Sequence, residues 1–197
     1  NLALANYNIG AALARLEKFE EAIGYYLKSL KMNPDDFSCH FDLGILFYEI
    51  GNVEQSVNHF EKALELNPES SKCYEYLGQC YLKAGKIESA LACFKNALNL
   101  DPKDLILYFR IGDIYLKEGE PQSALDFFEA GLKNNSVDAL LIYKKASTYA
   151  NMKKTPEALK ELAVAVGLNP NIRELVLTDL NFGYLFNNSD FKKIVKK

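Results

Sequence analysis

The sequence contains no tryptophan and only two histidines and four cysteines in its 197 residues. Histidine and cysteine, which often bind metal ions or act in catalysis, are therefore scarce, and they do not stand with carboxylate partners in a recognised metal-ligand spacing. Neither a Gly-rich phosphate loop nor a nucleophile elbow is present. We therefore expect no cofactor, no metal site and no catalytic residue, and we predict that the protein is not an enzyme.

Long apolar runs are also missing. No stretch approaches the roughly 18 to 20 apolar residues that span a bilayer, and no signal-peptide pattern opens the chain. The formal net charge of −3 provides no bulk attraction to nucleic-acid phosphates or anionic membranes. Neither nucleic acid nor a membrane is therefore an expected partner. The chain begins at Asn1, already near an amphipathic pattern, which indicates an excised or processed fragment.

What the sequence does have is a strict internal period of 34 residues. Small residues keep this period at Gly10, Gly44, Gly78, Gly112 and Ala146. A second series contains Pro34, Pro68, Pro102 and Pro170, with Ser136 in the remaining slot. A third consists of Ala22, Ser56, Ala90, Ala124 and Ala158. Such a period indicates stacked copies of one unit rather than a single globular core.

Residues 74–102, within the third copy, show how each unit is built. Its apolar residues recur at helical spacing on two segments, separated by the break Ala84-Gly85-Lys86. Gly78 and Ala90 lack bulk where two antiparallel helices must approach closely, so large neighbours can interlock around them. Pro102 cannot continue a helix interior and therefore ends the unit. Each copy is predicted to be a helix, a tight turn and a second helix.

These residues resemble the tetratricopeptide repeat family, whose pattern is an aromatic, Leu-Gly, Tyr, Ala, Phe and Pro. The third copy meets this pattern with Tyr74, Leu77, Gly78, Tyr81, Ala90, Phe94 and Pro102. The fifth copy departs most, with Lys145 in place of Leu and Ala146 in place of Gly. The resemblance implies an all-α, right-handed superhelical solenoid of five helix-turn-helix hairpins with a C-terminal helical cap.

The expected repeats are residues 3–36, 37–70, 71–104, 105–138 and 139–172, the last being divergent. Residues 173–197 are the expected cap, because an array leaves its last apolar face open and needs a terminal element with one polar side.

The resemblance also implies that the first helix of each repeat lines a concave groove. An aromatic residue recurs on this helix in every repeat, and a row of such rings suits the anchoring of a bound peptide or helix. The alternative is that some of these rings pack against the next repeat. We predict the following groove residues, which contact a partner: Tyr7, Asn8, Phe41, Asp42, Ile45, Glu75, Tyr76, Gln79, Phe109, Arg110, Asp113, Tyr143 and Lys144.

The predicted function is that of a non-catalytic protein–protein interaction scaffold that binds a peptide or helix of a partner protein in the concave groove. Two alternatives stay open: a substrate-recruiting or regulatory fragment of a larger enzyme, and a self-assembling structural scaffold. One branch of the family grips chaperone C-terminal tails with a Lys and an Asn. Tyr7 and Ala11 occupy those places here, so chaperone-tail binding is not expected.

The cysteines and histidines have structural interpretations. Cys39 and Cys73 occupy the same apolar repeat slot, which is typical of small packing residues in a reducing compartment. We therefore expect free thiols and a cytoplasmic location. His40 lies in an aromatic slot of the repeat, so we expect it to be a packed histidine rather than a ligand or a base.

Overall fold

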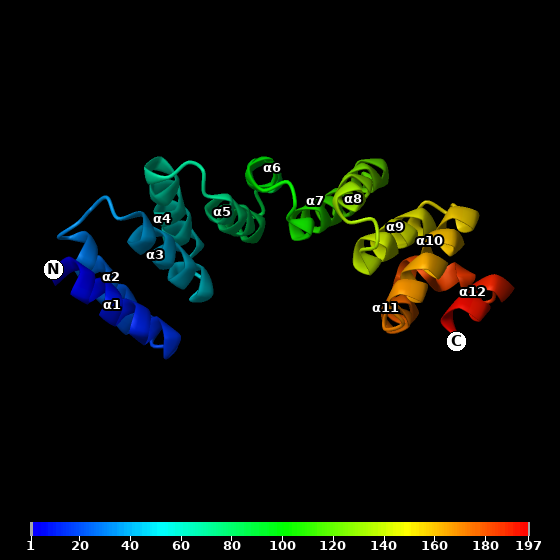
Figure 1. Ribbon diagram of the computed structural model, residues 1–197, viewed down its shortest axis with the longest axis horizontal. Coiled ribbons are helices and arrows are strands. Elements are labelled where there is room, and N and C mark those ends of the chain that lie inside the picture. The colour runs from blue at the N-terminus through cyan, green and yellow to red at the C-terminus, as the bar shows by residue number, and fades with distance from the viewer. Residues whose placement is uncertain (1, 197) are drawn as a thin grey trace. The chain divides into compact units, whose positions relative to one another are not determined.

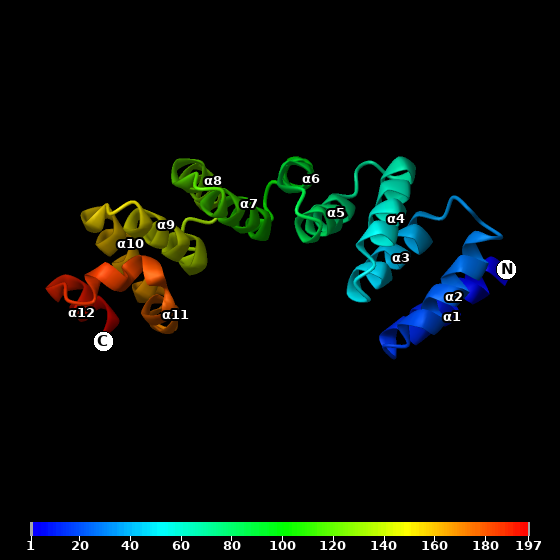
Figure 2. The ribbon, with the colours of Figure 1, turned by 180° about the vertical axis from the view of Figure 1, so that it is seen from behind.

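The computed structural model describes residues 2–196 and contains no strand in this range (Figures 1 and 2). Lys197, the last position of the predicted cap, lies outside the described residues. The chain forms two compact units, one ending at Pro102 and the other starting at Lys103. Within residues 2–196, no helix combines the length and apolarity that crossing a bilayer requires.

The first unit consists of three helical hairpins, and both views show the two helices of each hairpin side by side (Figures 1 and 2). Their helices are α1 (Leu2–Arg15) and α2 (Phe19–Leu30), α3 (Phe37–Glu49) and α4 (Val53–Leu66), and α5 (Ser71–Lys83) and α6 (Ile87–Leu100). Successive hairpins stack because α2 packs on α3, α4 packs on α5, and α3 also touches α5. The first helices α3 and α5 therefore contact each other directly.

The second unit holds two further hairpins and a terminal helical segment. Its elements are α7 (Leu105–Lys117), α8 (Pro121–Asn134), α9 (Ala139–Asn151), α10 (Thr155–Leu168), α11 (Ile172–Thr178), the short 3-10 helix η1 (Leu180–Leu185) and α12 (Ser189–Val195). Buried Val176, Phe182 and Phe191 of the terminal segment join the core of α9 and α10. This segment covers the last hairpin, as a cap should. The residue limits of the five repeats and the cap remain predictions.

Each of the first four hairpins is held by a glycine on its first helix that faces an aromatic ring on its second. A Cβ built on Gly44 would lie 2.6 Å from the ring of Phe60, and one on Gly112 would lie 2.2 Å from the ring of Phe128. Both rings are fully buried, so neither can move aside. The prediction that these small residues mark close helix approaches is confirmed.

The four cysteines are all buried and free. Cys39 and Cys73 donate from Sγ to the backbone carbonyls of Tyr26 and Phe60, each over 3.3 Å, so one repeat slot makes the same contact twice. Burial raises the pKa of the Cys39 and Cys73 thiols to about 12 and that of the Cys93 thiol to about 11. All four thiols are packed in the core, where those of Cys39 and Cys73 also hydrogen-bond.

The two histidines bond to each other across the second hairpin. His40 Nε2 lies 3.0 Å from the carbonyl oxygen of Pro34, which can only accept, so Nε2 carries the proton. His40 Nδ1 then accepts from His59 Nδ1, 3.0 Å away. The His59 ring also stacks on Phe47. Burial, with the neighbouring His40, lowers the pKa of His59 to about 4.

Two glycine substitutions of the same kind should have opposite effects on stability. Gly44→Ala places a methyl group against the buried ring of Phe60 and should lower the free energy of unfolding by about 1 to 3 kcal/mol. Gly24→Ala, inside α2 with nothing within 4 Å, should raise it by about 0.5 to 1 kcal/mol, since alanine favours helix. Urea denaturation measures both. Equal changes in the free energy of unfolding of the two variants would contradict the close approach of Gly44 to Phe60.

The histidine pair should make stability depend on pH. Unfolded His59 titrates near its ordinary pKa of 6.5 and folded His59 near about 4, so the unfolded state binds the proton first as pH falls. The contribution of neutral His59 to the free energy of unfolding is fully present above pH 6.5 and should be lost as the pH falls from about 6.5 to 4. We expect a steeper fall in melting temperature over this window for the wild type than for His59→Gln. Parallel curves would refute the shift.

The thiols should all be chemically free but slow to react in the folded protein. Because burial raises their pKa values, little reactive thiolate forms near neutral pH. A thiol reagent should modify the native protein slowly and should titrate four thiols after denaturation without reductant. A count below four in the denatured protein would reveal a disulfide and contradict the prediction.

Candidate functional site

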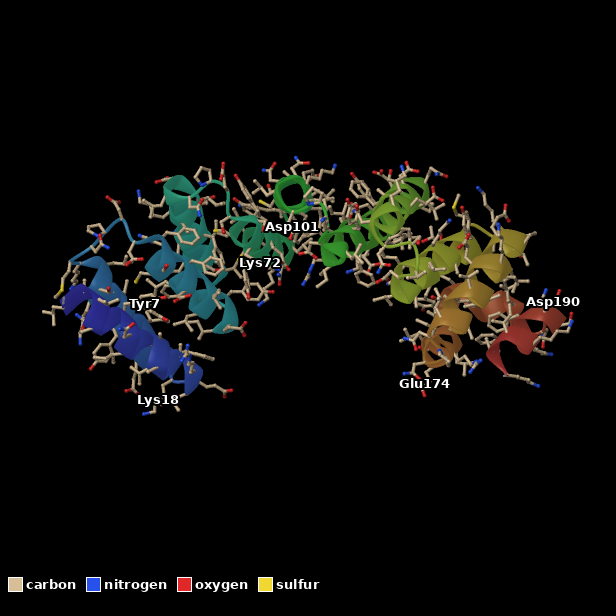
Figure 3. All side chains as sticks on the ribbon, viewed as in Figure 1. Tyr7, Lys18, Lys72, Asp101, Glu174 and Asp190 are labelled. Atoms are coloured by element: carbon tan, nitrogen blue, oxygen red, sulfur yellow. The ribbon has the colours of Figure 1, made fainter. Side chains whose placement is uncertain are left out.

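A carboxylate joins the first hairpin to α3. The phenol groups of Tyr7 and Tyr26 both donate to Asp42 Oδ2, over 2.8 Å and 3.2 Å respectively, and Tyr7 is labelled in Figure 3. The two tyrosine rings lie 5.4 Å apart between centroids. Because the three side chains come from α1, α2 and α3, one acidic group holds three helices together.

A cavity of about 370 Å³ opens beside this carboxylate, between the same three helices. Its lining residues are Tyr7, Ala11, Ala14, Arg15, Tyr26, Asp42, Ile45 and Leu46. Small side chains at Ala11 and Ala14 help to leave this space open. The structure thus brings together the predicted groove residues Tyr7, Asp42 and Ile45, whereas Asn8 is exposed and does not line the cavity.

The ionisable groups of this cavity perturb each other. Burial raises the pKa of Asp42, and the hydrogen bonds from Tyr7 and Tyr26 partly oppose that rise. Burial and the nearby Asp42 carboxylate raise the pKa of both phenols. Tyr7 and Tyr26 therefore remain protonated donors at neutral pH, and Asp42 is the acceptor.

The aromatic residues of the next two first helices pack on each other. Phe41 on α3 meets Tyr76 on α5 edge to face, with ring centroids 5.8 Å apart. Both rings contact Phe60, which stacks on Tyr76. Phe41 and Tyr76 are nevertheless only half-buried. These rings thus pack against the neighbouring repeat and still present part of their surface, and their contact with a partner stays a prediction.

Two further predicted residues of α5 differ in exposure. Glu75 is 7% exposed and forms an ion pair of 2.6 Å with Lys72 one turn earlier. Gln79 is half-buried. Glu75 therefore has little surface with which to touch a partner directly.

In the second unit, an ion pair lies beside an aromatic ring. Lys144 Nζ on α9 is 3.0 Å from Asp113 Oδ1 on α7 and lies 4.7 Å from the centroid of the Phe109 ring. All three side chains are half-buried, as is Arg110. The structure brings Phe109, Asp113 and Lys144 together as one amphipathic patch.

Tyr143 is bonded to the terminal segment. It is 7% exposed, and its phenol donates to Asp179 Oδ2 over 2.9 Å. Ser147 Oγ donates to the same oxygen over 2.6 Å, and the backbone N–H of Asn181 donates to Oδ1 over 3.0 Å. Asp179 of the cap therefore binds Tyr143, a predicted groove residue, and Tyr143 is buried. The sequence pattern did not single out Asp179.

A second, apolar cavity of about 260 Å³ lies at the beginning of α7 and α9. It is lined by Leu105, Ile106, Phe109, Asp138, Leu140 and Leu141. Ile106 is 55% exposed although it is apolar. Of these residues, only Phe109 was predicted from the sequence. The apolar run from Leu105 to Phe109 is the signal that could have pointed to the others.

Family models match several parts of the chain. Models described as tetratricopeptide repeat match residues 1–69, 59–92 and 106–138, and one described as TPR repeat matches residues 78–119. Consecutive matches overlap, so together they cover residues 1–138 without a gap. Comparison with curated protein sequences gave no match.

Solved structures with the same fold cover most of the chain. MamA is 20% identical, with 88% of this chain and 94% of that chain covered at a TM-score of 0.78. YrrB, described as a TPR protein with an unusual peptide-binding site, is 24% identical, with coverages of 86% and 87% and a TM-score of 0.71. A thermophilic TPR protein from Thermus thermophilus is 22% identical, with coverages of 89% and 95% and a TM-score of 0.57.

These likenesses concern the fold, since every identity is below 25%. The 34-residue period, the glycine–ring contacts of the hairpins and the four matched models agree with one another. The chain therefore belongs to the tetratricopeptide repeat family.

Proposed function

We propose that this chain is a non-catalytic interaction scaffold that binds a peptide or helix of a partner protein along its first helices. The observation that carries the proposal is the cavity between α1, α2 and α3, where Tyr7, Asp42 and Ile45 converge. Its volume of about 370 Å³ lies in the range of ligand pockets. YrrB, which shares the fold, is described as having a peptide-binding site.

The second unit supports the same function with different chemistry. Its apolar cavity at Ile106 and Leu140 suits a large apolar side chain of the bound segment, and such buried anchors supply most of the affinity in peptide recognition. The adjacent patch of Phe109, Asp113 and Lys144 adds polar groups and a ring to the same helices. The ligand is thus a peptide with apolar anchors flanked by charged residues.

Phe41, Tyr76 and Arg110 remain proposed contacts, because each is half-buried on a first helix. The buried Glu75 and Tyr143 have a supporting role in this proposal, since each holds a neighbour and has little free surface. We also propose a cytoplasmic setting, supported by the four free cysteines.

Self-assembly is a second candidate function, favoured by one observation. Several apolar side chains of α1 are exposed. They are Leu2, Leu4 and Ile9. Light scattering over a range of protein concentrations distinguishes this candidate from a monomeric scaffold, because a docking face of this kind would give a mass that rises with concentration.

A matched pair of substitutions in the second unit tests the binding face. A random peptide library is first selected on the wild-type protein, and the best peptide is then measured by calorimetry. Ile106→Lys, on a first helix, should weaken binding by about 1 kcal/mol or more, since it puts a charge into the apolar cavity. Val164→Lys, equally apolar and 46% exposed but on second helix α10, should leave the affinity unchanged.

The opposite pattern, with loss of binding only in Val164→Lys, would place the site on the second helices. Failure of the library to yield any binding peptide would refute peptide recognition itself. Melting temperatures of both variants are measured alongside, so that a loss of fold is not mistaken for a loss of contact.

A further inference from the structure

The carboxylate in the first-unit cavity has one oxygen engaged and one available. Asp42 Oδ2 accepts the hydrogen bonds of Tyr7 and Tyr26, whereas no side chain or backbone group among residues 2–196 donates to Oδ1. An ionised carboxylate can accept at both oxygens. Asp42 is half-buried and lines the cavity, so the unused acceptor lies where a ligand can enter.

Comparison with Asp179 shows that a carboxylate can link two helical segments with both of its oxygens engaged. Asp179 also accepts two side-chain hydroxyl groups at Oδ2, from Tyr143 and Ser147. Its Oδ1, however, accepts the backbone N–H of Asn181. Asp179 thus has both oxygens engaged inside the fold, whereas Asp42 performs the same joining role with one oxygen.

A cation is the ligand that best matches this environment. Burial of a carboxylate is unfavourable, and an opposite charge placed beside it offsets that cost with a short, charge-assisted hydrogen bond. Tyr7, which is half-buried and lines the cavity, offers aromatic surface to the same cation. Ala11 and Ile45 also line the cavity and provide apolar surface for the methylene stem of a lysine or arginine.

Arg15 defines the other end of the cavity. It lies in the last turn of α1, eight residues beyond Tyr7, which corresponds to about 12 Å along a helix. Its side chain is exposed, and no ion pair between it and Asp42 occurs in the described part of the chain. The cavity therefore has an acidic end and a basic end, which sets a direction for a bound segment.

We propose that this cavity selects a lysine or arginine side chain of the bound peptide, with Asp42 as its charge partner, and favours an acidic residue a few positions away near Arg15. This inference rests on the proposed function, since it names the chemistry of the peptide that the first unit recognises. It adds to the apolar anchoring proposed for the second unit, because the two cavities have different linings.

Selection of a random peptide display library on four proteins tests the inference. These are the wild type, Asp42→Asn, Arg15→Glu and Glu88→Gln, the last a loss of one exposed negative charge on second helix α6. We expect the wild type and Glu88→Gln to enrich peptides with a basic residue at a fixed position. Asp42→Asn should lose this enrichment and bind the leading wild-type peptide about tenfold or more weakly, as expected for loss of a charge-assisted bond.

Arg15→Glu provides an independent readout, because Arg15 is exposed and its replacement should not disturb the core. This variant should lose the preference for an acidic residue and select peptides with additional basic ones. Asp42→Asn keeps an oxygen that can accept from Tyr7 and Tyr26, and its melting temperature is compared with that of the wild type. If Asp42→Asn does not fold, the result with Arg15→Glu decides.

The outcomes separate this inference from the proposed function. Wild-type peptides without a fixed basic residue, or an unchanged basic preference in Asp42→Asn, would overturn the inference while peptide binding stands. An Arg15→Glu variant with wild-type charge preferences would do the same. A library from which the wild-type protein enriches no peptide would overturn both.

Discussion

The contact between a small residue on one helix and a ring on the next is the constraint on which the rest of this structure depends. Gly10, Gly44, Gly78 and Gly112 each face a ring at a separation that leaves little or no room for a Cβ. Because the two helices of a hairpin approach so closely, the ring is buried and the hairpin becomes a rigid unit. Repetition of one local contact every 34 residues then produces the stack.

Hydrogen bonds to carboxylates are a second kind of contact, and they link a hairpin to the segment that follows it. Asp42 ties α3 to the tyrosines of the first hairpin, and Asp179 ties the terminal segment to Tyr143 and Ser147 of α9. Asp42 lies on first helix α3 and lines the first-unit cavity, and Asp179 accepts hydrogen bonds from first helix α9. The hydrogen bond between Tyr7 and Asp42 therefore involves two residues that also line the proposed binding cavity.

Contacts within the fold reduce the surface of the first helices that is available to a partner. At the C-terminal end, the cap engages Tyr143 through Asp179, so this ring is removed from the row of potential contacts. Glu75 is buried and held by Lys72. In contrast, Ile106 and Arg15 retain exposed surface beside cavities. The proposed contact residues are thus those that packing between hairpins leaves uncovered, rather than every unpacked position on the first helices.

The sequence by itself determined the helical hairpins, the close approach at glycines such as Gly44 and the apolar slot of Cys39 and Cys73, because these follow from periodicity within one repeat. Only the tertiary structure decided that Tyr26 of a second helix bonds to Asp42 and that Tyr143 is covered. Those outcomes depend on which side chain of the following segment reaches Tyr26 or Tyr143, here Asp42 and Asp179. A helical period gives the direction of a side chain, but its exposure is decided by neighbours that are distant along the chain.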